Sequence, residues 1–173
     1  MSSFQIYDQF NLALYEQEYA GKLAKNEFNS SYLLAPLPNF DGSECPAFLP
    51  CSLAEIYEFD KEVQMLSISA GRRSIIFYCA PKSISVTRGA FLIGSHLIMS
   101  HDFLPDELYA AFKPIHKMLH CSNFGPHLSL ESCWRALYMA KCHGWVDFRN
   151  RFRAESEVAD DEPLIEEYLH YAR

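Results

Sequence analysis

Cys79 and Arg88 are the two residues whose types and order could carry out chemistry on a phosphate ester. Cys79 follows an apolar run, Ser74–Tyr78, and an apolar block, Ala90–Gly94, follows Arg88. Cysteine-dependent phosphatases place a cysteine and an arginine at the two ends of a loop between a strand and a helix. Backbone amides and the helix amino terminus then cradle the oxyanion and lower the pKa of the thiol.

The spacing argues against a working loop of this kind. Eight residues separate Cys79 from Arg88, whereas the phosphatase loop holds five. The predicted loop also contains Pro81, which has no amide hydrogen to donate, and the β-branched Ile84 and Val86, which suit tight turns poorly. No aspartate presents itself as a general acid. We therefore predict no catalytic residue and interpret Cys79 and Arg88 as the ends of a degenerate loop.

Strand and helix signals place this loop in an α/β domain. We expect strands at Phe10–Tyr15, at Tyr32–Leu34 (broken by Pro36) and at Ser74–Tyr78. We expect helices from a Ser52 and Glu55 capping box to Gly71, from roughly Arg88 to Met99 at the domain centre, from Pro105 to before Pro114, and from Ser129 to Gly144. The order predicts a layered fold with a short central mixed sheet flanked by helices and a helix-rich second half.

Charge and hydropathy narrow the classes of partner. The 173 residues carry 15 Lys and Arg against 22 Asp and Glu, a formal charge of -7. This balance disfavours binding to nucleic acid or to an anionic membrane surface. The amino terminus has no basic and apolar leader, and no run of 18 apolar residues occurs. We therefore expect an intracellular protein with a protein partner, no nucleic acid and no membrane.

Metal binding is a second chemical hypothesis. Zinc-ligating residue types occur at His116, His120, Cys121, Cys133, Cys142 and His143. No pair of cysteines has the close spacing of a zinc knuckle, and the six cysteines are scattered, so reduced thiols and surface histidines explain the pattern more simply. We predict no metal and no cofactor. The aromatic residues Tyr7, Phe10, Tyr15 and Tyr19 could form a docking surface, although a first strand explains them as well.

Several segments in the same order resemble one family. Ser74–His96, with its Ala90–Gly94 block, resembles the amino-terminal domain of the cell-division-cycle-fourteen family of dual-specificity phosphatases. Phe48–Phe59 is similar to a helix segment of that family, and Ser129–Phe148 is similar to its last helix and exit. Ile165–Arg173 is similar to the start of its interdomain linker. The resemblance implies a phosphatase-like domain over residues 1–154, strongest over 48–148, and an acidic linker-like tail over 155–173.

The resemblance also implies a role without catalysis. In that family the amino-terminal domain has the phosphatase fold but no catalytic loop, and the second domain does the chemistry. The first domain supports the second and contributes acidic groups to a groove that favours basic residues in the substrate. The tail carries acidic candidates for such binding at Asp160, Asp161, Glu162, Glu166 and Glu167. At Ser83–Val86 this sequence lacks the family's charged residues.

Three functions follow from these patterns. The first is a noncatalytic domain for protein binding, substrate recognition or scaffolding, with a catalytic phosphatase domain or a larger assembly as its partner. The second is a free-standing structural component of a larger assembly, which the resemblance implies to be cytoskeletal or ciliary because members of that family often reside there. The third is an active protein phosphatase. A downstream reading frame with a Cys–five residues–Arg loop would exclude the second. The expected location is the cytoplasm, cytoskeleton or cilium, and the nucleus stays open.

Overall fold

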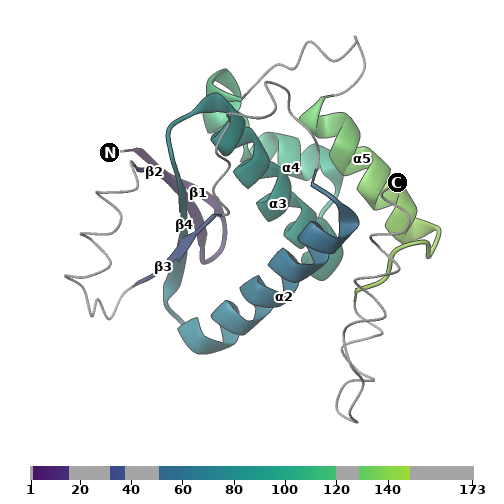
Figure 1. Ribbon diagram of the computed structural model, residues 1–173, viewed down its shortest axis with the longest axis horizontal. Helices are drawn as coiled ribbons and strands as arrows, with labels where there is room; N and C mark the ends of the chain where they lie inside the picture. The colour runs from purple at the N-terminus through teal and green to yellow at the C-terminus, as the bar shows by residue number, and fades with distance from the viewer. Residues whose placement is uncertain (1, 16–31, 38–50, 120–128, 149–173) are drawn as a thin grey trace.

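The computed structural model describes residues 2–15, 32–37, 51–119 and 129–148. Its four strands form one sheet in the order β1-β2-β4-β3 (Figure 1). β1 (Ser2–Tyr7) and β2 (Phe10–Leu14) pair antiparallel, and β4 (Ser74–Cys79) pairs parallel with β2 and with β3 (Tyr32–Pro36). The described part is therefore an α/β structure with a short mixed sheet, as the sequence predicts.

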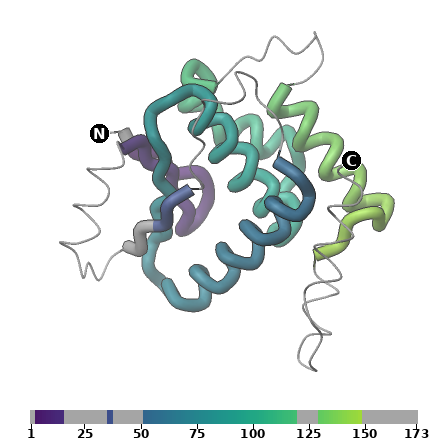
Figure 2. Tube along the Cα trace, in the orientation of Figure 1, coloured from purple at the N-terminus to yellow at the C-terminus, as the bar shows by residue number. Residues whose placement is uncertain are grey.

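Helices form the layers beside this sheet. They are α2 (Leu53–Ala70), α3 (Ser83–His101), α4 (Pro105–Ala111), the 3₁₀ helix η1 (Lys113–Met118) and α5 (Leu130–Cys142). α2 and α3 lie next to the sheet, and α5 packs on α3 from the far side (Figure 2). α3 is thus the central helix, and 13 of its 19 residues are buried. In the described ranges no helix has both the length and the apolar character needed to span a bilayer.

Local signals fix most helix ends as predicted. The Glu55 amide donates to Ser52 Oγ at 3.2 Å, and the Ser52 amide donates to Glu55 Oε2 at 2.7 Å, which completes the capping box. Gly71 ends α2 with a positive φ of 61°, a backbone conformation that glycine adopts without strain. Pro105 begins α4, and Ser129 caps α5 by accepting from the Ser132 amide at 3.1 Å.

The prediction of a loop up to Arg88 is wrong. α3 begins at Ser83, so only Ala80–Lys82 connect it to β4, and Arg88 lies inside the helix. The Val86 amide donates to the Lys82 carbonyl at 2.9 Å, and Thr87 Oγ1 donates to the Ser83 carbonyl at 2.7 Å. Val86 and Thr87 are both 1% exposed. Burial against the core thus outweighs the weak helix preference of the β-branched residues.

The sheet also departs from the prediction at its two edges. β1 was not expected, and it pairs with β2 across a tight turn in which Asp8 has a positive φ of 42°. Aspartate is one of the few non-glycine residues that tolerate this conformation. Pro36 does not break β3 but ends it. β3 is an edge strand, where a missing amide donor costs no ladder hydrogen bond.

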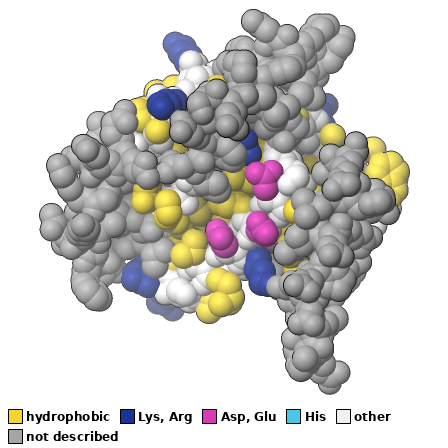
Figure 3. Space-filling model, viewed as in Figure 1, with side chains coloured by type: hydrophobic (Ala, Val, Ile, Leu, Met, Phe, Trp, Pro, Cys, Tyr) yellow, Lys and Arg dark blue, Asp and Glu magenta, His cyan; other side chains and the backbone are white. Residues whose placement is uncertain are grey.

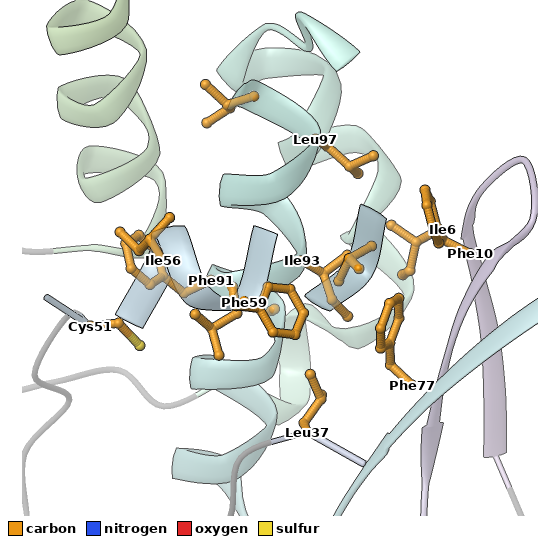
Figure 4. Packing of buried hydrophobic residues seen from close by; sticks show 14 of the residues in the cluster. Ile6, Phe10, Leu37, Cys51, Ile56, Phe59, Phe77, Phe91, Ile93 and Leu97 are labelled. Carbon is orange, nitrogen blue, oxygen red and sulfur yellow. The ribbon is translucent and has the colours of Figure 1, made fainter. Parts of the chain in front are cut away.

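The core lies between the sheet and the two neighbouring helices. Along β4 the buried residues are Ile75, Phe77 and Cys79, so alternate side chains share one face. Figure 4 shows Phe77 of β4 close to Phe59 of α2 and Ile93 of α3. Cys79, two residues after Phe77, has the same orientation and therefore enters the core instead of solvent.

α5 reaches α3 through a close contact at a glycine. A Cβ on Gly94 would lie 2.4 Å from Nε1 of Trp134, a residue of α5 that is 1% exposed. The indole Nε1 donates to the Phe91 carbonyl at 3.4 Å. Glycine at position 94 therefore lets the indole ring lie directly on the backbone of α3.

Candidate functional site

Cys79 lies in an apolar enclosure between β4 and α3. Its Sγ is 3.9 Å from the position that a Cβ on Gly89 would take, and Leu37 Cδ1 is 2.5 Å from the same point. The residue is 5% exposed. Burial raises the pKa of the thiol from its ordinary value of 9.0 to about 12. At pH 7 only about one thiol in 10⁵ is then a thiolate, the form that attacks phosphorus.

Arg88, the residue of α3 before Gly89, is directed toward α2. Its Nη2 donates to Glu55 Oε1 at 3.1 Å, while the second oxygen of Glu55 accepts from the Ser52 amide. Burial raises the pKa of Cys51 to about 11, and the charge of Arg88 offsets part of that rise. Burial is the only cause of the raised pKa of Cys79. The electrostatic effect of Arg88 on a thiol is therefore exerted at Cys51.

The structure does not bring Cys79 and Arg88 together as the two sides of one anion site. The thiol is directed toward Gly89 and Leu37, and the guanidinium is paired with Glu55. The loop length argued from sequence is not the reason, because the connection before α3 is short. The reason is that the helix begins before Arg88, and each helical residue turns the side chain by about 100°.

A second polar group, which the sequence reasoning missed, is buried between α2 and α3. Asp60 is 0% exposed and His96 is 2% exposed. The carboxylate accepts three hydrogen bonds, from His96 Nδ1 at 2.6 Å, from Ser100 Oγ at 2.7 Å and from Gln64 Nε2 at 2.7 Å. Because a carboxylate only accepts, Nδ1 of His96 carries the hydrogen. We call these four residues the Asp60 cluster.

The Asp60 cluster has the residue types of a catalytic triad but a different connectivity. In a triad the histidine lies between the acid and the nucleophile, whereas here Asp60 lies at the centre and Ser100 bonds to the acid. His96 Nε2 is buried and has no hydrogen-bond partner in the described part of the chain. The rings of Phe10 and His101 lie edge-on to His96, at centroid distances of 5.5 and 5.2 Å. The cluster is therefore a polar element of the core.

A sequence signal for this cluster does exist. Asp60 falls on the apolar stripe of α2, between Ile56 and Val63, and His96 follows the apolar block of α3. A charged residue at a core position needs a partner, because burying it unpaired costs several kcal/mol. That the two residues partner each other, 36 positions apart, depends on the packing of α2 against α3.

The residues of the metal hypothesis lie apart. His116 packs its ring on Tyr109 at 4.2 Å, Cys133 is buried, and Cys142 and His143 are exposed at the end of α5. His120 and Cys121 are outside the described residues. Within the described ranges no three or more histidine, cysteine or acidic side chains gather as a metal site, and the four cysteines there are free thiols.

Three of the four aromatic candidates for a docking surface lie in the described part of the chain, and the acidic candidates of the tail lie outside it. Tyr15 is buried at 6% exposure, and Phe10 is in the core, as a first strand requires. Tyr7 is 38% exposed and stacks edge-on to Phe103 at 4.5 Å. Tyr19 and the acidic candidates Asp160, Asp161, Glu162, Glu166 and Glu167 lie outside the described residues.

Among the described residues, two of the surface grooves carry exposed apolar side chains. The first follows one stripe of α2 and has a volume of about 790 Å³; it is lined by Tyr57, Glu58, Lys61, Glu62, Met65, Leu66 and Ser69. Figure 3 shows acidic and apolar side chains side by side over α2. The second, of about 310 Å³, lies between the start of α4 and α5 and is lined by Leu104, Pro105, Asp106, Arg135, Tyr138 and Met139. We call them the α2 groove and the α4–α5 groove.

No protein-family model and no curated protein matches this chain.

Proposed function

We propose that this chain is a noncatalytic phosphatase-type domain that acts by binding another protein. The observation that carries the proposal is the divergence of Cys79, at the end of β4, and Arg88, on α3. The residue that would have to be a thiolate has a pKa near 12 in an apolar enclosure. The residue that would have to bind phosphate is paired with Glu55. The thiol is therefore almost entirely protonated at neutral pH, and Nη2 of the guanidinium is engaged by Glu55.

The phosphatase-type part of the proposal is supported by the position of Cys79. It ends β4, which lies between β2 and β3 and is parallel to both, and a short connection follows into a buried helix. The carboxyl end of a central parallel strand is where α/β proteins place anion sites. The resemblance of Ser74–His96 to a noncatalytic phosphatase-family domain agrees with this position.

The protein-binding part is supported by the α4–α5 groove. Leu104 is 45% exposed and Met139 is 50% exposed on its two sides. At its edge Arg135 Nη2 lies 2.9 Å from Asp106 Oδ1. Exposed apolar side chains next to an arginine and a tyrosine match the composition of protein interfaces, which favour aromatic residues, methionine and arginine.

An activity assay tests the noncatalytic part. The full chain should not hydrolyse an aryl phosphate faster than buffer does between pH 5 and 8, and Cys79→Ser should behave the same. Cys142→Ser is the matched control, because Cys142 is exposed and is distant from β4 in the chain. Turnover that Cys79→Ser abolishes and Cys142→Ser leaves intact would overturn the proposal.

A purification from native source tests the binding part. We expect the tagged full chain to be recovered in one complex at a fixed stoichiometry. Met139→Glu should reduce that recovery by about tenfold, because a charge would be buried at the interface. Met118→Glu is the control, since Met118 is 39% exposed on η1 and outside the groove. Recovery as a free monomer, or equal loss with both variants, would contradict binding at this groove.

A further inference from the structure

The α2 groove is an apolar strip on an otherwise charged helix face. Met65 is 61% exposed and Ile68 beside it is 76% exposed, although the inner side of the same helix is buried against α3 and β4. Glu58 and Glu62 lie along the groove, so an occupant has to be apolar on one side and polar at its margins. Exposed apolar strips of this kind usually serve as contact surfaces.

The chain itself leaves the described part at one end of this groove. Phe148 is 1% exposed, and its ring lies 5.3 Å from the ring of Tyr57, which lines the groove. The chain after Phe148 is therefore tethered next to Tyr57, at one end of the α2 groove. A tethered segment meets its site at an effective concentration near the millimolar range, which an untethered partner rarely reaches.

The sequence after Phe148 contains a segment of matching pattern and length. Leu164, Ile165, Tyr168 and Leu169 recur at intervals that place apolar side chains on one face of a helix. The groove residues run from Tyr57 to Ser69, about 18 Å along the helix at 1.5 Å per residue. The ten residues 164–173 would span about 15 Å as a helix.

The intervening chain is long enough for either direction of docking. Residues 149–163 can extend over about 50 Å, more than twice the length of the groove. We propose that Leu164–Arg173 docks in the α2 groove of its own chain and covers Met65 and Leu66. This inference rests on the α2 groove and the exit of the chain at Phe148, and it does not depend on a partner at the α4–α5 groove.

Photo-crosslinking of the full chain tests the proposal. p-Benzoylphenylalanine at Met65 should crosslink within one chain to residues 164–173, as read by peptide mass spectrometry at micromolar concentration. The same group at Met118, which is exposed on η1, should not crosslink to that segment. Met65 is exposed, so the substitution should not perturb folding.

Variants of the tail make the outcome decisive. Leu169→Asp should reduce the Met65 crosslink by about tenfold or more, because it places a charge on the apolar face. Glu167→Gln, a change outside the apolar pattern, should leave the crosslink unchanged. An unchanged crosslink in Leu169→Asp would overturn the proposal. So would a crosslink between heavy and light isotope-labelled copies, which indicates a second chain, or no crosslink to 164–173 in the purified protein, which indicates an external occupant.

Discussion

Polar and ionisable side chains diverge near the amino end of α3 and converge near its carboxyl end. Near its amino end, the Cys79 thiol faces Gly89 and Leu37, whereas the Arg88 guanidinium pairs with Glu55. Near its carboxyl end, His96 and Ser100 converge on Asp60 with short hydrogen bonds. The comparison teaches that residue types alone do not make a site. At the carboxyl end the side chains converge in the core as a buried hydrogen-bonded cluster, and at the amino end they do not converge on one another.

The largest expected loss of stability follows from removing Asp60, which binds side chains near the carboxyl end of α3. Asp60→Ala would leave His96 Nδ1, Ser100 and Gln64 without their acceptor in the core. Leaving a buried donor without its acceptor costs about 1–3 kcal/mol of stability for each group. Urea unfolding should show that loss. Asp106→Ala, in an exposed pair with Arg135, should cost less than about 1 kcal/mol; equal losses from the two variants would remove the distinction between the pairs.

Gly89 and Gly94 of α3 differ in how rigid the side chains packed against them are. Gly94→Ala would place a Cβ 2.4–2.6 Å from three atoms of the rigid Trp134 indole, and should destabilise the fold by about 1–3 kcal/mol. For Gly89→Ala the one close contact is Leu37 Cδ1 at 2.5 Å, the end of a side chain that can rotate, and the next atoms lie at 3.8 and 3.9 Å. Alanine also favours the helix by about 1 kcal/mol, so Gly89→Ala should be nearly neutral.

Thermal or urea unfolding of both glycine variants gives the measurement. A larger loss for Gly89→Ala than for Gly94→Ala would mean that the α3 surface toward β4 is packed more rigidly than the surface toward α5.

The Cys79 thiol should make the stability of the fold depend on pH in alkaline solution. The folded pKa of Cys79 is about 12, above its ordinary value of 9.0, so the neutral thiol is favoured in the folded state. Its stabilising effect is complete below pH 9 and is lost as the pH rises from 9 toward 12. Relative to Cys79→Ala, the native protein should lose about 1 kcal/mol more between pH 9 and 10.

Comparing slopes removes the contribution of the other titrating groups, which both proteins share. Met118→Ala, which removes no titrating group at an exposed position, should retain the native slope. Identical slopes for native protein and Cys79→Ala would show that the thiol is not enclosed as described.

The smallest expected effect is at the ion pair of Arg88. Glu55→Gln can keep the hydrogen bonds of the capping box, since glutamine also fits that position, but it removes the charge facing Arg88. Glu55 is half-exposed, so the loss should be about 0.2–1 kcal/mol and should shrink at high salt. A loss that is independent of salt would indicate that the cap was damaged.

Local signals in the sequence predict most of the fold. Ser52 with Glu55, Pro105, and Ser129 each provide a hydrogen-bonding or conformational cue within one helical turn, and the helices begin as expected. The start of α3 was missed because Lys82 provides no side-chain cap, and the β-branched residues after it favour extended structure. Burial against the sheet determines where α3 begins, and no local sequence pattern reports that burial.

The same limit applies to the candidate site. Whether Cys79 faces Arg88 depends on the residue at which α3 begins, because a shift of a few positions rotates the guanidinium around the helix. In the Asp60 cluster, His96 and Ser100 lie 36 and 40 residues after Asp60 in the sequence. Sequence alone indicates that Asp60 needs a partner, and the packing of α2 against α3 selects which one.

Lys141 of α5 links two helices in a way that bears on local unfolding. Its Nζ donates to the Ile98 and Met99 carbonyls at the end of α3, and it pairs with Asp102 Oδ1 at 2.7 Å. Those carbonyls would have to be solvated whenever α5 detached. α5 and the last turn of α3 should therefore open as one cooperative unit, with amide hydrogens that exchange at a common free energy, while the sheet side of α3 stays closed.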